Sequence, residues 1–478
     1  MGRQRAAEDF EQLETQRHST AHAMKTKTSS IAKAAVTRRD FLKATAAVAA
    51  PMIVPASVLG LDGKTAPSNR VTMAFIGVGN QGSGDMQQFL KDDRVQVVAV
   101  CDPNRESAGY WNGSVRGRDP ARKGVDEFYA KQRASGQYRG CAAHEDFREV
   151  YGNKSIDAVE IATPDHWHAY MVVAAAAAGK DIYCQKPLSL TVRDGRLMSD
   201  AVKNTKRVFQ TGSQQRSDKN FRLACELVRN GRLGKLKTVK VGQPPGRPDF
   251  GKTGDRKKPE RVPEGFNYDL WLGPAPDAPY APARCHVNFR WIYDYSGGQV
   301  TDWGGHHPDI AQWGMGMEQT GPVEIRNAKG VFPPDELWDT ATEYHFEAVY
   351  KDGAVMVVSD KFPNGVRFEG SDGWVFVSRG KIEAEPKSLL TEAFGEKDTR
   401  LYVSENHFRN FIDCVQSRKE CVAPCEQAHR SITVAHLGNI AMLLRQDIKW
   451  DPVKEQIIGN PAAQWMLDRP SRAPWKLV

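Results

Sequence analysis

Residues 71–82 read VTMAFIGVGNQG, and this stretch decides the fold of the chain. Its first six residues form an apolar run typical of a buried strand, and Gly77, Gly79 and Gly82 follow in a Gly-x-Gly-x-x-Gly pattern. In a turn from strand to helix, the first glycine permits a tight bend, the second lets a pyrophosphate approach the backbone, and the third lets helix and strand pack closely. The stretch therefore predicts a dinucleotide-binding Rossmann turn, with a helix over residues 83–90.

A second apolar run, residues 95–100, leads to Asp102, twenty residues after the last glycine of the turn. An acidic side chain at this spacing can accept hydrogen bonds from ribose hydroxyls and would repel a 2′-phosphate, so NAD is favoured over NADP. Arg105 leaves NADP open because a guanidinium can pair with a phosphate, and a surface salt bridge is the alternative for it. Asn80 and Gln81 lie inside the turn and are expected to contact the same cofactor.

Strand and helix patterns alternate through the rest of this half, as a doubly wound parallel sheet requires. Residues 156–162 and 181–184 predict strands, and a polar loop follows each of them. Ligands bind at the carboxyl ends of parallel strands, so both loops are expected to face the cofactor cleft. The cofactor contacts predicted in these loops are Thr163, Pro164, His166, His168 and Lys186.

The pattern changes in the second half. Runs at 342–350, 355–360, 366–370 and 374–378 alternate with turn signals, which predicts a mostly antiparallel sheet. Residues 242–290 are rich in proline and long for a connection, which indicates a functional loop or an interface arm. The predicted fold class is α/β, with a Rossmann domain over residues 70–188 and a C-terminal substrate domain over residues 189–478.

The first 61 residues predict an export leader. Residues 37–43 read TRRDFLK, and the apolar stretch 44–54 after them is shorter than the roughly 20 residues that span a bilayer. This resembles a twin-arginine signal, so we expect the twin-arginine export machinery as a partner, a periplasmic or otherwise exported location, and no stable membrane anchor. A short buried helix is the alternative. Residues 1–23 precede a second methionine and have no place in such a signal.

Charge and cysteine content argue against two other classes of protein. The formal net charge is +8, but the first 60 residues hold nine Lys or Arg against five Asp or Glu, so no nucleic-acid partner is expected. The eight cysteines are scattered, and several lie in apolar runs typical of the protein core. Cys421 and Cys425 have no neighbouring Cys or His that completes a zinc-like set, so we predict no metal site.

Four motifs together resemble the Gfo/Idh/MocA family, named for glucose-fructose oxidoreductase, inositol dehydrogenase and a rhizopine catabolism protein. They are IGVGNQG at 76–82, ATPDHWH at 162–168, CQKPL at 184–188, and Asp302-x-x-x-His306-x-x-Asp309. The resemblance implies a second domain whose open antiparallel sheet helps to form a homo-oligomer, a dimer or tetramer. It also implies a sugar or polyol substrate held between that sheet and the nicotinamide of a cofactor, which a folded exported protein would have to hold tightly.

The resemblance further implies a catalytic set of Lys186, Asp302 and His306. Oxidation of an alcohol requires removal of its hydroxyl proton, and a neutral imidazole is suited to accept it. His306 is expected in that role, with Lys186 bonding the same oxygen and Asp302 orienting the pair. The family usually has Glu-Lys-Pro where this chain has Gln185-Lys186-Pro187, and without that carboxylate we expect a lower pKa for Lys186.

A single helix over residues 302–313 would place Asp302, His306 and Asp309 on one face. The neighbouring candidates for substrate contact are Arg290, Trp291 and His307. For the histidines, a structural role is the alternative, and for Arg290 a salt bridge with Asp294.

Three functions remain open from the sequence. The first is NAD(P)-dependent oxidation of a hydroxyl on a sugar or cyclitol by hydride transfer. The second is cleavage of a glycoside through transient oxidation of the sugar, with no net redox change. The third is sugar binding without catalysis, which only the glutamine at position 185 supports.

Overall fold

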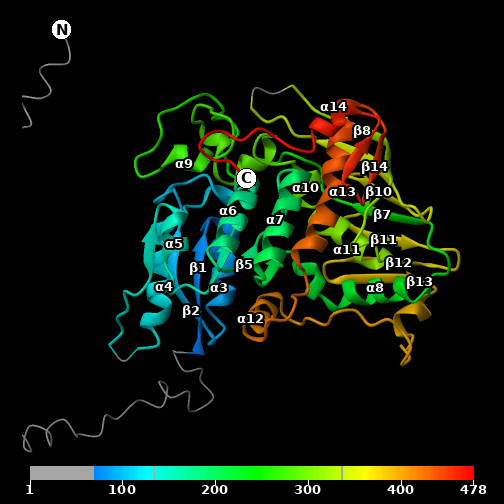
Figure 1. Ribbon diagram of the computed structural model, residues 1–478, viewed down its shortest axis with the longest axis horizontal. Helices are drawn as coiled ribbons and strands as arrows, with labels where there is room; N and C mark the ends of the chain where they lie inside the picture. Colours follow the sequence, from blue (N-terminus) through cyan, green and yellow to red (C-terminus); the bar gives the residue numbers. More distant parts are fainter. Residues whose placement is uncertain (1–68, 134, 335–336, 478) are drawn as a thin grey trace, which may run out of the picture. The chain divides into compact units, whose positions relative to one another are not determined.

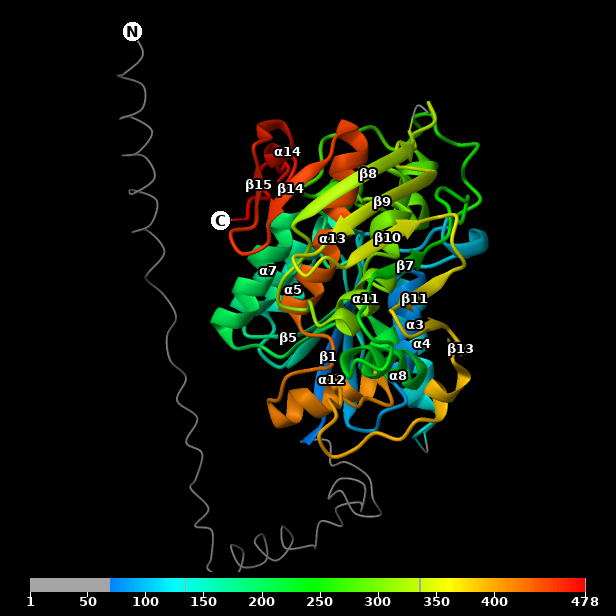
Figure 2. The same ribbon diagram turned by 90° about the vertical axis from the view of Figure 1, so that its right-hand side faces the viewer.

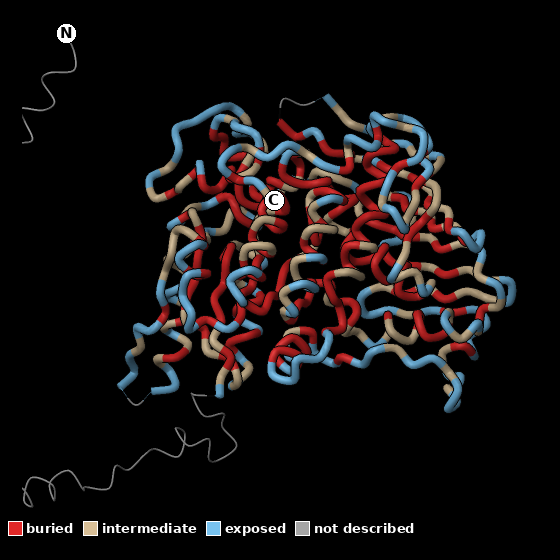
Figure 3. Tube along the Cα trace, viewed as in Figure 1, coloured by how far each residue is buried: buried red, intermediate tan, exposed pale blue. Residues whose placement is uncertain are grey.

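The computed structural model describes residues 69–133, 135–334 and 337–477, and in these residues the chain forms two β-sheets with helices packed around them (Figure 1). The predicted leader at residues 1–61 lies outside the described residues. Buried residues lie mostly in the strands and in the helices packed on them, and exposed residues are concentrated in the loops (Figure 3).

The first sheet is parallel and has the strand order β3-β2-β1-β4-β5-β6, as the glycine turn predicts. Its last strand lies beyond residue 188, the boundary expected from the sequence, because Phe209–Thr211 pairs in parallel with β5. The strands are β1 (Val71–Ile76), β2 (Val95–Cys101), β3 (Ala142–His144), β4 (Ala158–Ile161), β5 (Asp181–Cys184) and β6 (Phe209–Thr211). The helices of this half are α3 (Asn80–Phe89), α4 (Arg118–Ala130), α5 (Phe147–Gly152), α6 (Asp165–Ala177) and α7 (Val192–Thr205).

The second sheet has nine described strands in the order β13-β12-β11-β7-β10-β9-β8-β14-β15 (Figure 2). β7 and β10 pair in parallel and the other pairs run antiparallel, so the predicted fold class is confirmed. The strands are β7 (Thr238–Gly242), β8 (Glu324–Val331), β9 (Glu343–Val349), β10 (Val355–Ser359), β11 (Gly365–Glu369), β12 (Trp374–Ser378), β13 (Lys381–Glu385), β14 (Ile448–Asp451) and β15 (Gln456–Ile458).

Helices cover one face of this sheet: α8 packs on β12, α11 on β11, and α13 on β8 and β9. The burial of alternate residues in β9 and β12 follows from this one-sided cover, because neighbouring side chains of a strand point to opposite faces. The helices of this half are α8 (Lys219–Arg229), α9 (Tyr268–Leu272), α10 (Gln299–Asp302), α11 (His307–Met315), α12 (His407–Ser417), α13 (Cys425–Leu444) and α14 (Pro461–Trp465).

The proline-rich connection from 242 to 290 runs from β7 to α10, within the second half, and packs against the first domain. Its aromatic side chains, with Trp291 and Tyr295, form a buried apolar cluster of their own. The backbone of this segment also bonds to the first domain, since Arg105 N–H donates to the Gly265 carbonyl and Asn267 N–H to the Pro103 carbonyl. The segment is therefore a packed connection that reaches the cofactor half.

All eight cysteines are buried free thiols, as the apolar runs around them predict. Among the described residues, no helix is both long and apolar enough to cross a membrane.

Candidate active site

The glycine turn fits a dinucleotide. Gly77 has a φ of +82°, and a Cβ there would lie 2.7 Å from the Ala162 backbone. A Cβ on Gly82 would lie 2.0 Å from the Gly77 carbonyl oxygen, so only glycine lets α3 start this close to β1. The turn and the amino end of α3 thus form a cradle of backbone N–H groups of the kind that binds pyrophosphate.

Asp102 lies beside this turn at the end of β2. Its carboxylate accepts hydrogen bonds from the backbone N–H groups of Val78, at 3.0 Å, and Asn104, at 2.9 Å. Burial raises the pKa of Asp102 to about 6, against the opposing effect of these two bonds. Arg105 pairs with Glu264 at 3.8 Å on the surface, as the salt-bridge alternative predicts. An acidic group therefore lines the cavity beside the glycine turn, where its charge would repel a 2′-phosphate.

A cavity of about 850 Å³ runs from the glycine turn to the second domain. Eleven of the predicted site residues line it: Gly77, Gly79, Asn80, Gln81, Asp102, Thr163, Pro164, Lys186, Arg290, Asp302 and His306. Five do not: Gly82, His166, His168, Trp291 and His307. The structure thus brings the predicted cofactor turn and the predicted catalytic set into one cavity.

His166 and His168 lie behind the cavity wall. His166 Nε2 lies 3.1 Å from the Trp271 carbonyl oxygen, and burial lowers the pKa of this imidazole to about 4. His168 lies between two carbonyl oxygens, that of Pro187 at 2.8 Å and that of Thr163 at 3.0 Å. The prediction that these histidines contact the cofactor is not supported, because α6 begins at Asp165 and turns both side chains inward. His168 instead joins the two loops that line the cavity.

Trp291 and His307 were predicted to touch substrate and do not reach the cavity. Trp291 is fully buried in the aromatic cluster of the 242–290 connection, beside Phe250. His307 is buried with Nδ1 2.7 Å from the Gly242 carbonyl oxygen, so it joins α11 to β7. Both residues have the structural role that their burial requires.

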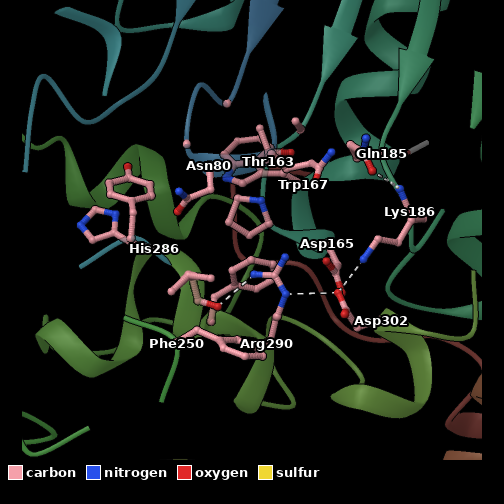
Figure 4. A pocket seen from close by; sticks show the side chains of 18 of the residues that line it. Asn80, Thr163, Asp165, Trp167, Gln185, Lys186, Phe250, His286, Arg290 and Asp302 are labelled. Atoms are coloured by element: carbon pink, nitrogen blue, oxygen red, sulfur yellow. Dashed lines mark hydrogen bonds and ion pairs between the residues drawn. The ribbon is translucent and has the colours of Figure 1, made fainter. Parts of the chain in front are cut away.

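Lys186, Asp302 and Arg290 form a partly buried ionic cluster (Figure 4). Lys186 Nζ lies 2.9 Å from Asp302 Oδ1, and Arg290 Nε lies 3.2 Å from the same oxygen. Burial alone would raise the pKa of Asp302, but the positive charges of Lys186 and Arg290 outweigh burial and hold that pKa well below its usual range. One ionised carboxylate therefore holds two cations that come from residues more than 100 positions apart.

His306 lies at the break between two helices. The single helix expected over 302–313 is wrong: α10 ends at Asp302 and α11 begins at His307, with a turn between them. Pro308 lies in the first turn of α11, where a proline is tolerated because its missing N–H would be unpaired anyway. A Cβ on Gly305 would lie 2.8 Å from Lys186 Cβ, so the turn packs directly against the lysine.

The surroundings of His306 keep its imidazole uncharged. It is buried, and its Nδ1 has no hydrogen-bond partner within the described part of the chain. Burial, and after it the charges of Lys186 and Arg379, hold the pKa of His306 well below its ordinary value. The ring is therefore neutral near pH 7.

Asp309 does not share a face with the other two members of its motif. Its carboxylate forms a bidentate ion pair with the buried Arg216, at 2.6 and 2.8 Å, and accepts a hydrogen bond from Ser431. This pair fixes α11 from behind the cavity. Asp309 is a positioning residue.

Gln185, where the family usually has a glutamate, forms a hydrogen bond with a buried carboxyl group. Its Nε2 donates to the buried carboxylate of Asp85, while its Oε1 accepts from the Lys186 backbone N–H at 3.2 Å. Burial raises the pKa of Asp85, and burial together with Asp85 raises that of the neighbouring Glu160 well above its ordinary value. A third carboxyl group, at position 185, would face this acidic pair, whereas the amide of Gln185 donates to it.

Sequence reasoning missed four charged residues of the cavity, Glu145, Asp165, Arg247 and Arg379. Asp165 accepts a hydrogen bond from the Ser296 hydroxyl at 2.5 Å, and burial raises its pKa to about 7 despite that bond. Asp165 stands between Pro164 and His166 in the ATPDHWH motif, so this motif could have identified it as a site residue. Arg379 lies outside every motif, and only the fold brings it to the site.

Family models match both halves of the chain. The "Oxidoreductase family, NAD-binding Rossmann fold" matches residues 71–213, and the "Oxidoreductase family, C-terminal alpha/beta domain" matches residues 219–477. The chain belongs to the Gfo/Idh/MocA oxidoreductase family. Its first domain is an NAD-binding domain. A model of twin-arginine translocation signals also matches this Gfo/Idh/MocA protein, at residues 35–55, so the predicted export signal is confirmed.

Relatives of this Gfo/Idh/MocA protein include sugar dehydrogenases and glycosidases. A myo-inositol 2-dehydrogenase of Thermotoga maritima is 24% identical over 335 residues, which cover 66% of this chain and 85% of the relative. An alpha-N-acetylgalactosaminidase of Shewanella oneidensis is 26% identical over 216 residues, which cover 42% of this chain and 44% of the relative. The crystal structure of an aldose-aldose oxidoreductase from Caulobacter crescentus has the same fold, with a TM-score of 0.55, 19% identity, and cover of 80% and 99% of the two chains.

Proposed function

We propose that the protein oxidises a hydroxyl group of a sugar or cyclitol by hydride transfer. The observation that carries the proposal is that Lys186, Asp302 and His306 line the same cavity as the glycine turn. NAD, when bound in that turn, supplies the hydride acceptor. Gly77, Gly79 and Asp102 would hold it.

The residues of the chain handle the proton. His306 is neutral and accepts the hydroxyl proton of the substrate; its buried Nδ1 leaves Nε2 as the accepting atom. Lys186 donates a hydrogen bond to the same hydroxyl oxygen and stabilises the negative charge that develops on it. Asp302 stays ionised and holds Lys186 in position.

We further propose that the cofactor stays bound between turnovers. Two segments meet over the cavity: the Trp111 and Phe250 rings stack at 4.1 Å, and the Asn112 N–H donates to the Phe250 carbonyl. Trp111 and Phe250 both line the cavity. A cofactor loaded before export would be retained by such a cover, and the enzyme would then regenerate it with a second substrate.

The test uses the folded protein purified without added nucleotide. Release of NAD on denaturation, and growth of the reduced-nicotinamide absorbance when sugars are added to the native protein, support the proposal. Protein that contains no NAD and that reduces neither added NAD nor added NADP with any sugar or cyclitol contradicts it.

Glycoside cleavage is the second candidate, and Asp165 favours it. A carboxyl with a pKa of about 7 in the cavity can give a proton to a leaving alcohol at neutral pH. The 26% identity to an alpha-N-acetylgalactosaminidase also supports it. Release of p-nitrophenol from aryl glycosides without net reduction of NAD would select this function over dehydrogenation.

We also propose a homo-oligomer, a dimer or a tetramer. The face of the second sheet away from its helices carries half-exposed apolar side chains, among them Val355, Val357, Trp374 and Phe376. Light scattering on the purified protein should give a mass of two or four chains, and a single-chain mass at micromolar concentration would contradict this.

A further inference from the structure

Arg379 is a cation at the mouth of the cavity. It follows β12 and lines the cavity beside Asp302 and His306. Its guanidinium carbon lies 5.1 Å from the centre of the Trp303 ring. Within the described part of the chain, the guanidinium forms no ion pair and no hydrogen bond, so its donors remain available to a ligand.

Positive charge exceeds negative charge at this end of the cavity. Lys186 and Arg290 share the single ionised carboxylate of Asp302, and Arg379 adds a third cation without adding a partner. Asp165 offsets this only in part, because its pKa of about 7 leaves it partly protonated at neutral pH.

The other charged groups of the cavity have partners of their own. Asp102 is bonded to the glycine turn, and Glu145 pairs with Arg118. Arg247 donates to the Trp338 carbonyl. The carbonyl does not cancel the charge of Arg247, but three cations against one ionised carboxylate gather at the end where Lys186 and His306 would meet the substrate.

Arg379 and His306 flank the same indole. The His306 ring centre lies 5.7 Å from that of Trp303, which also lies under the Arg379 guanidinium. A substrate whose hydroxyl group reaches His306 would place its adjoining substituents over Trp303, and aromatic faces of this kind pack against the C–H faces of sugars. A substituent on the same ring would then reach Arg379.

We infer that the substrate is an acidic sugar and that Arg379 binds its carboxylate. The inference rests on the proposed function and adds the substrate class. The planar guanidinium fork matches a carboxylate in a bidentate arrangement, and one unpaired arginine balances a single negative charge. A phosphate ester carries nearly two charges and would need a further cation at the same place.

The experiment compares matched sugars on the wild-type protein and on Arg379→Gln. Glucose, glucuronate and glucose 6-phosphate form one set, and galactose and galacturonate a second. Turnover in the presence of an electron acceptor that reoxidises the bound cofactor gives kcat and KM, and thermal shift gives binding that needs no turnover. We expect the wild type to prefer the uronate over its parent hexose in at least one set, by KM and by thermal shift.

In Arg379→Gln, the KM for the preferred uronate should rise about tenfold, the size expected for loss of one charge-assisted hydrogen bond at a half-open site, while kcat stays within about threefold. The KM for the parent hexose should change by much less than the KM for the uronate. Lys381→Gln is the matched control, because Lys381 lies two residues further on, outside the cavity, and pairs with Glu383 at the surface.

Three outcomes would overturn the inference: uronates that neither turn over nor stabilise the wild type better than the parent hexoses, a better response to glucose 6-phosphate, or an equal effect of Arg379→Gln on acid and neutral sugars. Failure of the proposed function has a different signature. In that case no sugar reduces NAD, while the thermal shift with uronates still reports whether Arg379 recognises a carboxylate.

Discussion

The two ends of the cavity are built in different ways. The cofactor end consists largely of backbone from seven consecutive residues, 76–82, and its glycines allow the turn to pack closely against neighbouring backbone. The substrate end consists of charged side chains, Lys186, Arg290 and Asp302, that come from separate segments and meet on one carboxylate. A contiguous stretch can therefore bind the cofactor, whereas the catalytic side chains come together only when both sheets have folded.

The largest expected effect is at the substrate end. Lys186→Met removes the hydrogen-bond donor to the reacting oxygen and leaves Asp302 to Arg290, so turnover should fall by about 10²- to 10⁴-fold. NAD content should stay the same, because the glycine turn is untouched. Steady-state kinetics and NAD released on denaturation measure the two.

The exposed Lys203→Met on α7 is the control and should match the wild type. Loss of NAD together with activity in Lys186→Met would mean that the two ends are not separable.

Asp309→Ala tests the ion pair between Asp309 and Arg216, which holds α11 in place at the substrate end. The change leaves the fully buried Arg216 without its bidentate partner, and breaking such a pair should lower the free energy of unfolding by about 3–5 kcal/mol. Denaturant unfolding measures it. Asp413→Ala breaks a half-exposed pair with Arg94 and should cost at most about 1 kcal/mol. Similar losses in both variants would refute the positioning role.

The pKa of Asp165 predicts a stability change with pH. Its folded pKa of about 7 exceeds the unfolded value of about 3.9, so between these values the folded state binds the extra proton. The free energy of unfolding should therefore fall as pH rises from about 4 to about 7, by up to about 4 kcal/mol from this group.

Asp165→Asn keeps a polar partner for Ser296 and should remove most of this slope, which unfolding curves at several pH values measure. Asp277→Asn, in an exposed loop, should keep the wild-type slope. An unchanged slope in Asp165→Asn would contradict the assigned pKa.

The smallest expected effect is at the cofactor end, where alanine substitutions of two glycines in α3 can be compared. Gly82→Ala places a Cβ against the Gly77 carbonyl and should weaken NAD binding and cost about 1–3 kcal/mol of stability. Gly84→Ala meets no atom within 4 Å and should stabilise α3 by up to about 1 kcal/mol. Thermal unfolding, and calorimetric titration of NAD into protein stripped of its cofactor, would separate the two variants. Equal behaviour would contradict the close-packed turn.

The sequence predicts the cofactor end well because its signals are local. The apolar run before Gly77, the spacing of the glycines and the position of Asp102 each depend on neighbours in the chain. The strands at 342–350, 355–360, 366–370 and 374–378 were found for the same reason, by their alternating pattern. The predicted domain boundary at residue 188 leaves β6 in the second domain, although β6 pairs with β5 of the first sheet. A strand of three residues is too short for its sequence pattern to show which sheet it joins.

The substrate end was predicted in part. The pair Lys186 and Asp302 followed from motifs, but the helix over 302–313 did not form, since Gly304, Gly305 and Pro308 favour a break. His307 and Trp291 are polar or aromatic and near the site in sequence, yet packing turns them away from the cavity. Arg379 is distant in sequence, and it enters the site because β12 ends at the same edge of the sheet as β7, with the start of β11 between them.

A crystal structure of the protein with NAD tests the central claim most directly. The account predicts the pyrophosphate on the turn at residues 77–82, with the nicotinamide ring beside Lys186 Nζ and the His306 imidazole. A nicotinamide ring bound away from these two side chains, or NAD bound outside the cavity, would contradict it.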